Sequence, residues 1–232
     1  MPDRSAIMRI VERQMRNWEL SRAQKPAGPA PAPAAQVEDF VTISRIVGAG
    51  GREVAAELGK RLAWPVFDRE ILQAMAGDDS IRSRLYEHLD ERDVGWLEDA
   101  LRWLVEDGVH KGQYFHRLGE TILALARKGR AIFLGRGADL FLPRDRGLRV
   151  LLIAPLDHCA RAVAKRQNIS PALARAEVER VQQERTEFLR SHFGKAADRP
   201  TRHDLVFNTA HFSIAEVVEL ICQALRLRGV LS

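Results

Sequence analysis

A β-branched run that ends at a glycine cluster, with a helical pattern directly after it, constrains the fold of this chain most. Residues 40–47 read FVTISRIV, and Gly48, Gly50 and Gly51 follow them closely. Residues 52–62 then repeat their apolar side chains at helical spacing. The order strand, glycine loop, helix is the context in which backbone N–H groups at a helix N-terminus surround phosphate oxygens.

The rest of the chain alternates strand and helix signals. Four more runs are short and apolar, as strands buried on both faces should be: residues 64–67, 131–135, 149–154 and 204–208. Helical stretches stand among them, at residues 111–129, 156–167, 171–190 and 213–227. This alternation predicts an α/β fold with a parallel sheet and right-handed crossovers.

The long span between the second and third strands carries no strong strand signal. We expect a helical insertion there, at about residues 71–128, with Trp96 and Trp103 seven residues apart on one helix face. His110 and His116 lie in the same span, and their spacing matches neither a zinc site nor a nucleophile and its base.

Residues 1–25 are predicted to form an amphipathic helix. One apolar stripe runs along it at steps of four, four and three residues: Ile7, Val11, Met15 and Trp18. Such a helix can bind a membrane surface, a partner or a second copy of the chain. More often it covers an apolar patch of its own or a sister domain, and we favour that docking.

A proline-rich stretch separates this helix from the main domain. Residues 26–38 hold four of the ten prolines and are predicted to be an extended, semi-rigid linker. We therefore expect the main domain at residues 39–230, a length that can bury a substantial core.

Composition narrows the class of function. The net charge is +5, but residues 1–25 hold six Lys/Arg against three Asp/Glu, which leaves thirty against twenty-eight elsewhere. No basic element with a nucleic-acid module is evident, so a phosphorylated small molecule fits better than nucleic acid. Cys159 and Cys222 have neither disulfide nor zinc spacing. With no membrane-spanning run and no signal peptide evident, we expect a cytoplasmic protein.

The glycine cluster departs from the phosphate-binding motif GxxxxGK[ST]. Aligned by the glycines, Gly51 stands at the lysine position and Arg45 at the first glycine position, with Arg52 and Glu53 just after. Such glycines also occur where a turn needs only positive φ. Arg45 and Arg52 could supply the cationic contact, although arginine is not a direct replacement for lysine. The usual Ser/Thr ligand of Mg²⁺ is missing too.

Six segments, in order, resemble the cytidylate-kinase-like family. They span residues 42–221 and read TISRIVGAGGREVAAELGKRL, VFDREIL, IFLGRGADLFLP, VLLIAPL, QQERTEFLRSHFG and HDLVFNTAHFSIAEVVELI. The resemblance implies a three-layer P-loop NTPase fold with a five-stranded parallel sheet, a helical insertion for a monophosphate acceptor and an arginine-bearing lid. It also implies ATP and Mg²⁺ as cofactors. Transfer of a phosphoryl group from ATP depends on the positioning of the substrates and the neutralisation of phosphate charge more than on covalent bonds to the protein.

The resemblance assigns site residues by position. The ATP phosphate loop would be Gly48, Ala49, Gly50, Gly51 and Arg52. Asp68 and Arg69, after the second strand, would face the acceptor phosphate or the metal. Arg136 matches the arginine of a GRD motif that contacts the acceptor nucleotide, whereas Gly137 stands in place of its aspartate, which weakens the case for cytosine specificity. Asp139, two residues further on, is not assigned that role.

The lid is assigned in the same way, and no metal ligand is assigned. Arg161 and Arg166 follow Cys159, which stands where the family favours arginine. Arg185 fits a D-x-x-R pattern in which Gln182 replaces the aspartate. The expected catalytic residues are Arg52, Asp68, Arg136 and Arg185. The expected nucleotide-binding residues are Arg45, Glu53, Arg161, Arg166 and the phosphate loop.

Two questions stay open at this point. Asp68 suits a helix N-cap as well as a catalytic role, because Asp is a preferred cap. The chain is expected to be a nucleotide kinase that transfers the γ-phosphoryl group of ATP to a nucleoside monophosphate such as CMP. The alternative is a catalytically degenerate P-loop module that binds a nucleotide or another anion for a regulatory role.

Overall fold

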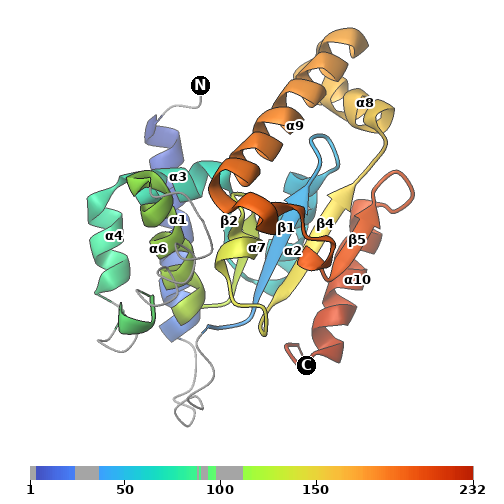
Figure 1. The fold of residues 1–232 in the computed structure, drawn as a ribbon. Coiled ribbons are helices and arrows are strands. Elements are labelled where there is room, and N and C mark those ends of the chain that lie inside the picture. The colour runs from blue at the N-terminus through green and yellow to red at the C-terminus, as the bar shows by residue number, and fades with distance from the viewer. Residues whose placement is uncertain (1–3, 24–36, 88, 90–93, 98–111, 232) are drawn as a thin grey trace.

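Five strands form one parallel sheet in the order β2-β3-β1-β4-β5 (Figure 1). The computed structural model describes residues 4–23, 37–87, 89, 94–97 and 112–231, so most of the expected linker, Trp103 and His110 lie outside the described residues. The strands are β1 (Phe40–Arg45), β2 (Val66–Phe67), β3 (Ala131–Leu134), β4 (Leu148–Ile153) and β5 (Leu205–Asn208). The predicted five-stranded parallel sheet of an α/β fold is confirmed.

Helices cover both faces of this sheet. The first half of the chain supplies α1 (Arg4–Ala23), α2 (Gly51–Leu62), α3 (Arg69–Gly77), α4 (Asp79–Tyr86) and α6 (Gln113–Lys128). The second half supplies α7 (Ala138–Phe141), α8 (Leu156–Gln167), α9 (Pro171–Phe193), the 3-10 helices η1 (Gly194–Asp198) and η2 (Pro200–Arg202), and α10 (Ile214–Leu227). In the described residues, α3, α4 and α6 stand between β2 and β3, where helices were predicted.

The alternation of side chains along β3 separates two hydrophobic cores. Ala131 and Phe133 enter the core formed with α1, α3, α6 and α7, whereas Ile132 and Leu134 enter the core formed with α2, α8 and α10. All four side chains are buried. This is the pattern of a central parallel strand, whose two faces are both covered.

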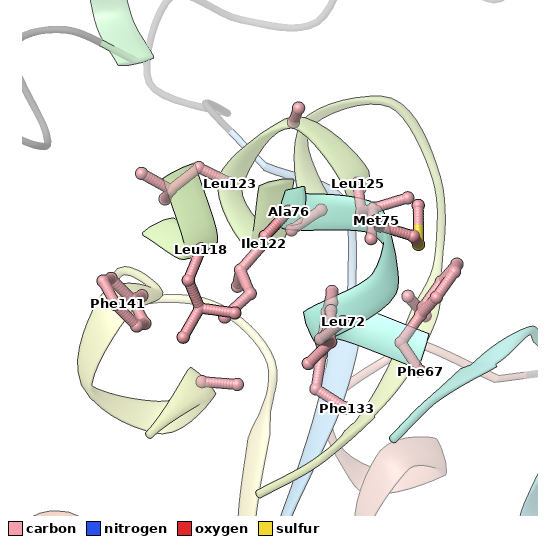
Figure 2. Close-up of a cluster of buried hydrophobic side chains, with 14 of the residues drawn as sticks. Phe67, Leu72, Met75, Ala76, Leu118, Ile122, Leu123, Leu125, Phe133 and Phe141 are labelled. Atoms are coloured by element: carbon pink, nitrogen blue, oxygen red, sulfur yellow. The ribbon is translucent and has the colours of Figure 1, made fainter. Parts of the chain in front are cut away.

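The first core joins the insertion helices to the sheet. Figure 2 shows Leu72 and Met75 of α3 and Ile122 of α6 in one cluster of buried side chains with Phe133 of β3. Phe133 also stacks on Phe67 of β2, with ring centroids 5.8 Å apart. The aromatic side chains therefore anchor the insertion on the sheet and fix the position of the loops after β2 and β3.

The N-terminal helix packs on the same core. Val11, Met15 and Trp18 have no exposed surface. The indole Nε1 of Trp18 donates a hydrogen bond to the carbonyl oxygen of Leu125, at 3.1 Å. A β-carbon at Gly129 would lie 2.6 Å from that nitrogen, so the ring rests directly on the backbone. The favoured prediction, that this helix covers a patch of its own chain, is confirmed.

The carboxyl ends of the strands share one edge of the sheet. The loops after β1, β2, β3 and β4 meet there, which is where open α/β sheets bind ligands. Helices α8 and α9 lie against each other and project past this edge (Figure 1). Within the described part of the chain, no helix combines the length and apolar character needed to cross a membrane.

Candidate functional site

Two adjoining hollows lie at the carboxyl edge of the sheet. The phosphate-loop pocket, of about 340 Å³, is lined by the loop after β1, by Asp68 and by parts of α8 and α9. The inner cavity, of about 600 Å³, lies between α9, the ends of β1, β3 and β4, and the segment 197–203. Six residues line both hollows: Arg45, Ile46, Arg69, Val181, Glu184 and Arg185. The two hollows therefore form one continuous site.

The glycine loop has a backbone suited to phosphate. Gly48 and Gly50 take left-handed φ values of 86° and 73°, which a side chain would disfavour. A β-carbon at Gly48 would also lie 2.6 Å from the carbonyl oxygen of Cys159. Gly50 is the N-cap of α2 and provides no side-chain hydrogen bond. The first N–H groups of this helix are left for a ligand, and its dipole favours an anion.

The Arg45 side chain occupies the space that a lysine at position 51 would need. A β-carbon on Gly51 would lie 2.8 Å from Cγ of Arg45. Further along the side chain, a β-carbon on Gly135 would lie 1.9 Å from Nη1. The side chain therefore crosses the start of α2, and its guanidinium reaches the end of β3.

Arg45 belongs to a group of arginines that we call the arginine cluster: Arg45, Arg69, Arg136 and Arg185. Burial lowers the pKa of Arg45 to about 9, with further lowering by the charges of Arg185 and Arg52. Burial likewise lowers the pKa of Arg185 to about 10, and the charge of Arg69 adds to the effect. Among the described residues, no carboxylate lies within ion-pair distance of the cluster. Such crowded positive charge favours an anionic ligand.

Arg136 is held in a strained conformation at the end of β3. Its φ is 57°, between Gly135 at 81° and Gly137 at 67°. The guanidinium stacks on the ring of Phe188, 4.7 Å from the centroid, and Nε is buried without a hydrogen-bond partner. Burial lowers the pKa of Arg136. A non-glycine residue in this region persists only where its surroundings hold it, and such residues concentrate at functional sites.

Helix α9 closes over the end of β1. The side-chain oxygen Oε1 of Gln182 accepts a hydrogen bond from the Val47 amide at 3.2 Å. Nη1 of Arg185 donates to the carbonyl oxygen of Arg45 at 3.4 Å. The two residues assigned to the lid pattern therefore both contact the backbone that leads into the phosphate loop.

Position 137 has no room for a side chain. A β-carbon there would lie 2.4 Å from Cε2 of Phe193, in addition to the strain of the positive φ. Asp139 does not replace the missing carboxylate, because it is buried and binds Arg202, with Nη2 to Oδ1 at 3.1 Å. Oδ1 of Asp139 also accepts from the hydroxyl of Ser44 at 3.3 Å. This carboxylate therefore has a structural role, because it links the end of β1 to the segment that carries Arg202.

Asp68 is the N-cap of α3. Its Oδ1 accepts from the amides of Glu70 and Ile71, at 2.9 Å and 3.0 Å, which confirms the capping interpretation. Asp68 also lines the phosphate-loop pocket, so a catalytic role remains a prediction. Arg52 lines the same pocket and pairs with Glu70 at 2.9 Å.

The structure gathers most of the remaining predicted residues and leaves two apart. Glu53 and Arg166 line the phosphate-loop pocket. The Ala49 side chain is buried within the loop, and Arg161 is exposed on α8; neither lines the two hollows. Sequence reasoning did not identify Phe188, although Val181, Arg185 and Phe188 follow one face of α9 at helical spacing.

Segment 197–203 brings two residues that were not predicted as site residues. Arg202 and His203 line the inner cavity. Burial lowers the pKa of His203, while the charge of Asp139 acts in the opposite direction. Arg202 ends the second 3-10 helix and His203 follows it, and only the fold places them beside β3 and β4.

The phosphate-loop pocket fits the phosphates of a nucleotide better than it fits a metal held by the protein alone. Among the residues that the structure describes, no group of three His, Cys, Asp or Glu could hold a metal ion. Mg²⁺ commonly binds one or two carboxylates together with substrate phosphates and water. Asp68 and Glu53 line the pocket without an arginine partner, so they are the residues that would hold it. The ion would neutralise phosphate charge there.

Known proteins resemble this chain over most of its length. The sequence profile of the cytidylate kinase-like family matches residues 40–211. A cytidylate kinase of Halobacterium salinarum is 26% identical over 186 residues, which cover 80% of this chain and 88% of that protein. The crystal structure of an uncharacterized protein from Eubacterium ventriosum superposes with a TM-score of 0.59 at 16% identity, over 82% of this chain and 99% of that one.

Proposed function

This chain belongs to the cytidylate kinase-like family, and from that premise we propose that it transfers the γ-phosphoryl group of ATP to a nucleoside monophosphate such as CMP. The donor phosphates bind at residues 48–53, and the acceptor binds in the inner cavity. One observation carries this assignment: Arg45 and Arg185, together with Arg69, line both hollows. A phosphoryl group that passes from donor to acceptor moves past these guanidinium groups.

Arg45 takes the place of the absent lysine in this proposal. Phosphoryl transfer develops charge on the oxygens of the transferring group, and preorganised cations stabilise that charge. The Arg45 side chain starts at the first glycine position and crosses Gly51, the lysine position. The positive charge therefore enters the site from the strand that precedes the loop, in place of the helix that follows it.

The other members of the arginine cluster bind the acceptor, and the start of α2 binds the donor. Arg136 and Arg69 line the inner cavity, where they bind the acceptor phosphate. The N–H groups at the start of α2 bind the donor phosphates. A bound anion also offsets the mutual repulsion of the arginines, and that relief contributes to binding. When bound, Mg²⁺ neutralises donor charge and orients the phosphates.

The test is an ADP-release assay with ATP, Mg²⁺ and CMP. We expect Arg45→Ala to lower kcat by about 100-fold or more, the loss typical of removing one preorganised donor. Arg175→Ala is the matched control, because Arg175 is exposed on α9, pairs with Asp157 and lines neither hollow. Equal activity of Arg45→Ala and the wild type, at equal thermal stability, would contradict the assignment.

The second candidate function is a regulatory module that binds a nucleotide or another anion and transfers no phosphoryl group. Gly51 at the lysine position favours it, because the loop lacks the residue that normally contacts the β and γ phosphates. A degenerate module of this kind would bind ATP in calorimetry and release no ADP with any common nucleoside monophosphate. We also propose a cytoplasmic location, because the proposed reaction consumes ATP and a nucleoside monophosphate. Buried free thiols at Cys159 and Cys222 agree with a reducing compartment.

A further inference from the structure

We propose that the inner cavity selects its acceptor by the phosphate and does not distinguish cytosine from uracil. The reaction in this inference rests on the proposed function, whereas the binding can be measured without a donor. The acceptor class is therefore a phosphomonoester, with the pyrimidine ring contributing apolar contact alone.

The charges that line the cavity point to an anion. Arg69, Arg136 and Arg185 line it with no carboxylate at ion-pair distance among the described residues. The two carboxylates that also line it are both engaged. Asp198 pairs with Arg190 at 3.3 Å, and Glu184 pairs with Arg180. The unpaired charge of the cavity is thus positive, and a phosphate matches it.

Among the described residues that line the cavity, the uncharged polar side chains Ser44, Gln182 and Thr186 already hold other hydrogen-bond partners. Cytosine presents an N–H₂ donor where uracil presents a carbonyl, so preference for cytosine requires a hydrogen-bond acceptor aimed at that edge. The Gln182 oxygen already accepts from the Val47 amide. The Ser44 hydroxyl donates to Asp139, and the Thr186 hydroxyl donates to the carbonyl oxygen of Gln182. Position 137 is closed to any carboxylate by its positive φ and by the ring of Phe193.

Apolar side chains make up much of the remaining wall. They are Leu151 and Ile153 of β4, and Val181 and Leu189 of α9. Such a wall binds a planar ring through buried apolar surface and dispersion contacts, and both contributions are nearly equal for cytosine and uracil. Sites that bind a substrate group through a buried hydrogen bond reject an analogue without that group by about 10⁴-fold or more. We expect no preference of that size between CMP and UMP.

The chemistry also favours a phosphate over an alcohol as the attacking group. A phosphate oxygen is already anionic at neutral pH, so it attacks the γ-phosphorus without losing a proton. A P–O bond forms, the bond from the γ-phosphorus to the β–γ bridging oxygen breaks, and ADP leaves with that electron pair. An alcohol would need a base to take its proton. Neither His203 nor Asp68 provides such a base in the inner cavity, because Nε2 of His203 is buried and Asp68 lines the other hollow.

Calorimetric titration of the full chain without ATP tests this inference. The four titrants are CMP, UMP, ribose 5-phosphate and cytidine. We expect CMP and UMP to bind within about threefold of each other, ribose 5-phosphate within about tenfold of CMP, and cytidine at least about 30-fold more weakly. Arg136→Gln should weaken all three phosphates by about tenfold or more, since Arg136 lines the inner cavity alone. Arg175→Gln should leave them unchanged.

Three results would overturn the inference. One is CMP binding at least about 30-fold tighter than UMP, which requires a group that reads the base. The second is cytidine binding as well as CMP. The third is phosphate binding that Arg136→Gln leaves intact, which would place the acceptor elsewhere. Failure of the proposed function is a separate result: the titrants bind as expected, and no ADP appears when ATP and Mg²⁺ are added.

Discussion

Gly51 and Arg45 exclude each other's side chains: a β-carbon on Gly51 would lie 2.8 Å from Cγ of Arg45. Cγ is close to the backbone, so the arginine has to leave its position when the β-carbon is added. The glycine at the lysine position is therefore the counterpart of the arginine at the first glycine position. A lysine added at position 51 alone would displace the cation that is already present.

The first prediction uses the smallest change at this pair. Gly51→Ala should lower the affinity for ATP by about tenfold, because it displaces the Arg45 charge from the pocket. Gly51→Lys should fail to raise phosphoryl transfer for the same reason. Gly77→Ala is the control, since a β-carbon at Gly77 meets nothing within 4 Å. Calorimetry with ATP measures the affinity, and an unchanged value for Gly51→Ala would show that Arg45 is not needed where it lies.

The second prediction separates the capping role of Asp68 from its charge. Asn caps helices as well as Asp does, so Asp68→Asn should keep the free energy of unfolding within about 0.5 kcal/mol. Loss of the carboxylate should lower phosphoryl transfer by about 100-fold or more if Asp68 acts on phosphate or metal. Asp78→Asn is a matched control, because Asp78 caps α4 through the amides of Ser80 and Ile81. Equal activity of the two variants would leave Asp68 with the cap alone.

The third prediction concerns the docking of α1. Trp18 is fully buried, so Trp18→Ala should lower the free energy of unfolding by about 3 to 5 kcal/mol, as for other large buried side chains. Leu20→Ala, at a side chain that is 54% exposed, should change it by less than about 0.5 kcal/mol. Urea denaturation of the full chain gives both values. A loss below about 1 kcal/mol for Trp18→Ala would mean that the helix is not part of the folding unit.

The fourth prediction is a pH dependence of stability. Burial lowers the pKa of His203 below its ordinary value of 6.5, with Asp139 and Asp204 opposing and Arg202 and Arg144 adding to the effect. Below about pH 6.5 the unfolded chain therefore binds a proton that the folded chain does not, so stability falls as the pH drops through that value.

His203→Gln should reduce this loss, measured as the difference between urea midpoints at pH 7.5 and pH 5.0. His211→Gln, at an exposed side chain, serves as the control. Identical differences for the wild type and both variants would exclude His203 as the source of the loss.

The fold was predictable because its signals are local. The run at residues 40–47, the glycines after it and the helical pattern of residues 52–62 each follow from neighbouring side chains. The second strand was predicted at residues 64–67 and spans Val66–Phe67, since Pro65 has no N–H to donate to a ladder. Packing at the core, such as Phe67 on Phe133, then follows from apolar residues on adjacent strands.

The site was less predictable, because it depends on contacts between distant segments. Arg45 was identified as a candidate from its place in the motif, but its route across Gly51 to Gly135 requires the ends of β1 and β3 to be neighbours. Arg161 and Arg166 share one helix, yet only Arg166 lines a pocket, and which of the two does so depends on how α8 meets α9. The left-handed φ of Arg136 has no sequence signature beyond the glycines that flank it.

That Arg45 and Arg185 border both hollows has a thermodynamic consequence. Two anionic ligands that draw on the same cations cannot bind independently. Whatever factor the donor imposes on the affinity of the acceptor, the acceptor imposes on the donor, because the coupling free energy is reciprocal. Neutralising the shared guanidinium groups with the first ligand leaves a weaker field for the second, so under the proposed function we expect donor and acceptor to weaken each other's binding at equilibrium. The order in which they arrive then affects how fast the ternary complex forms and leaves its stability unchanged.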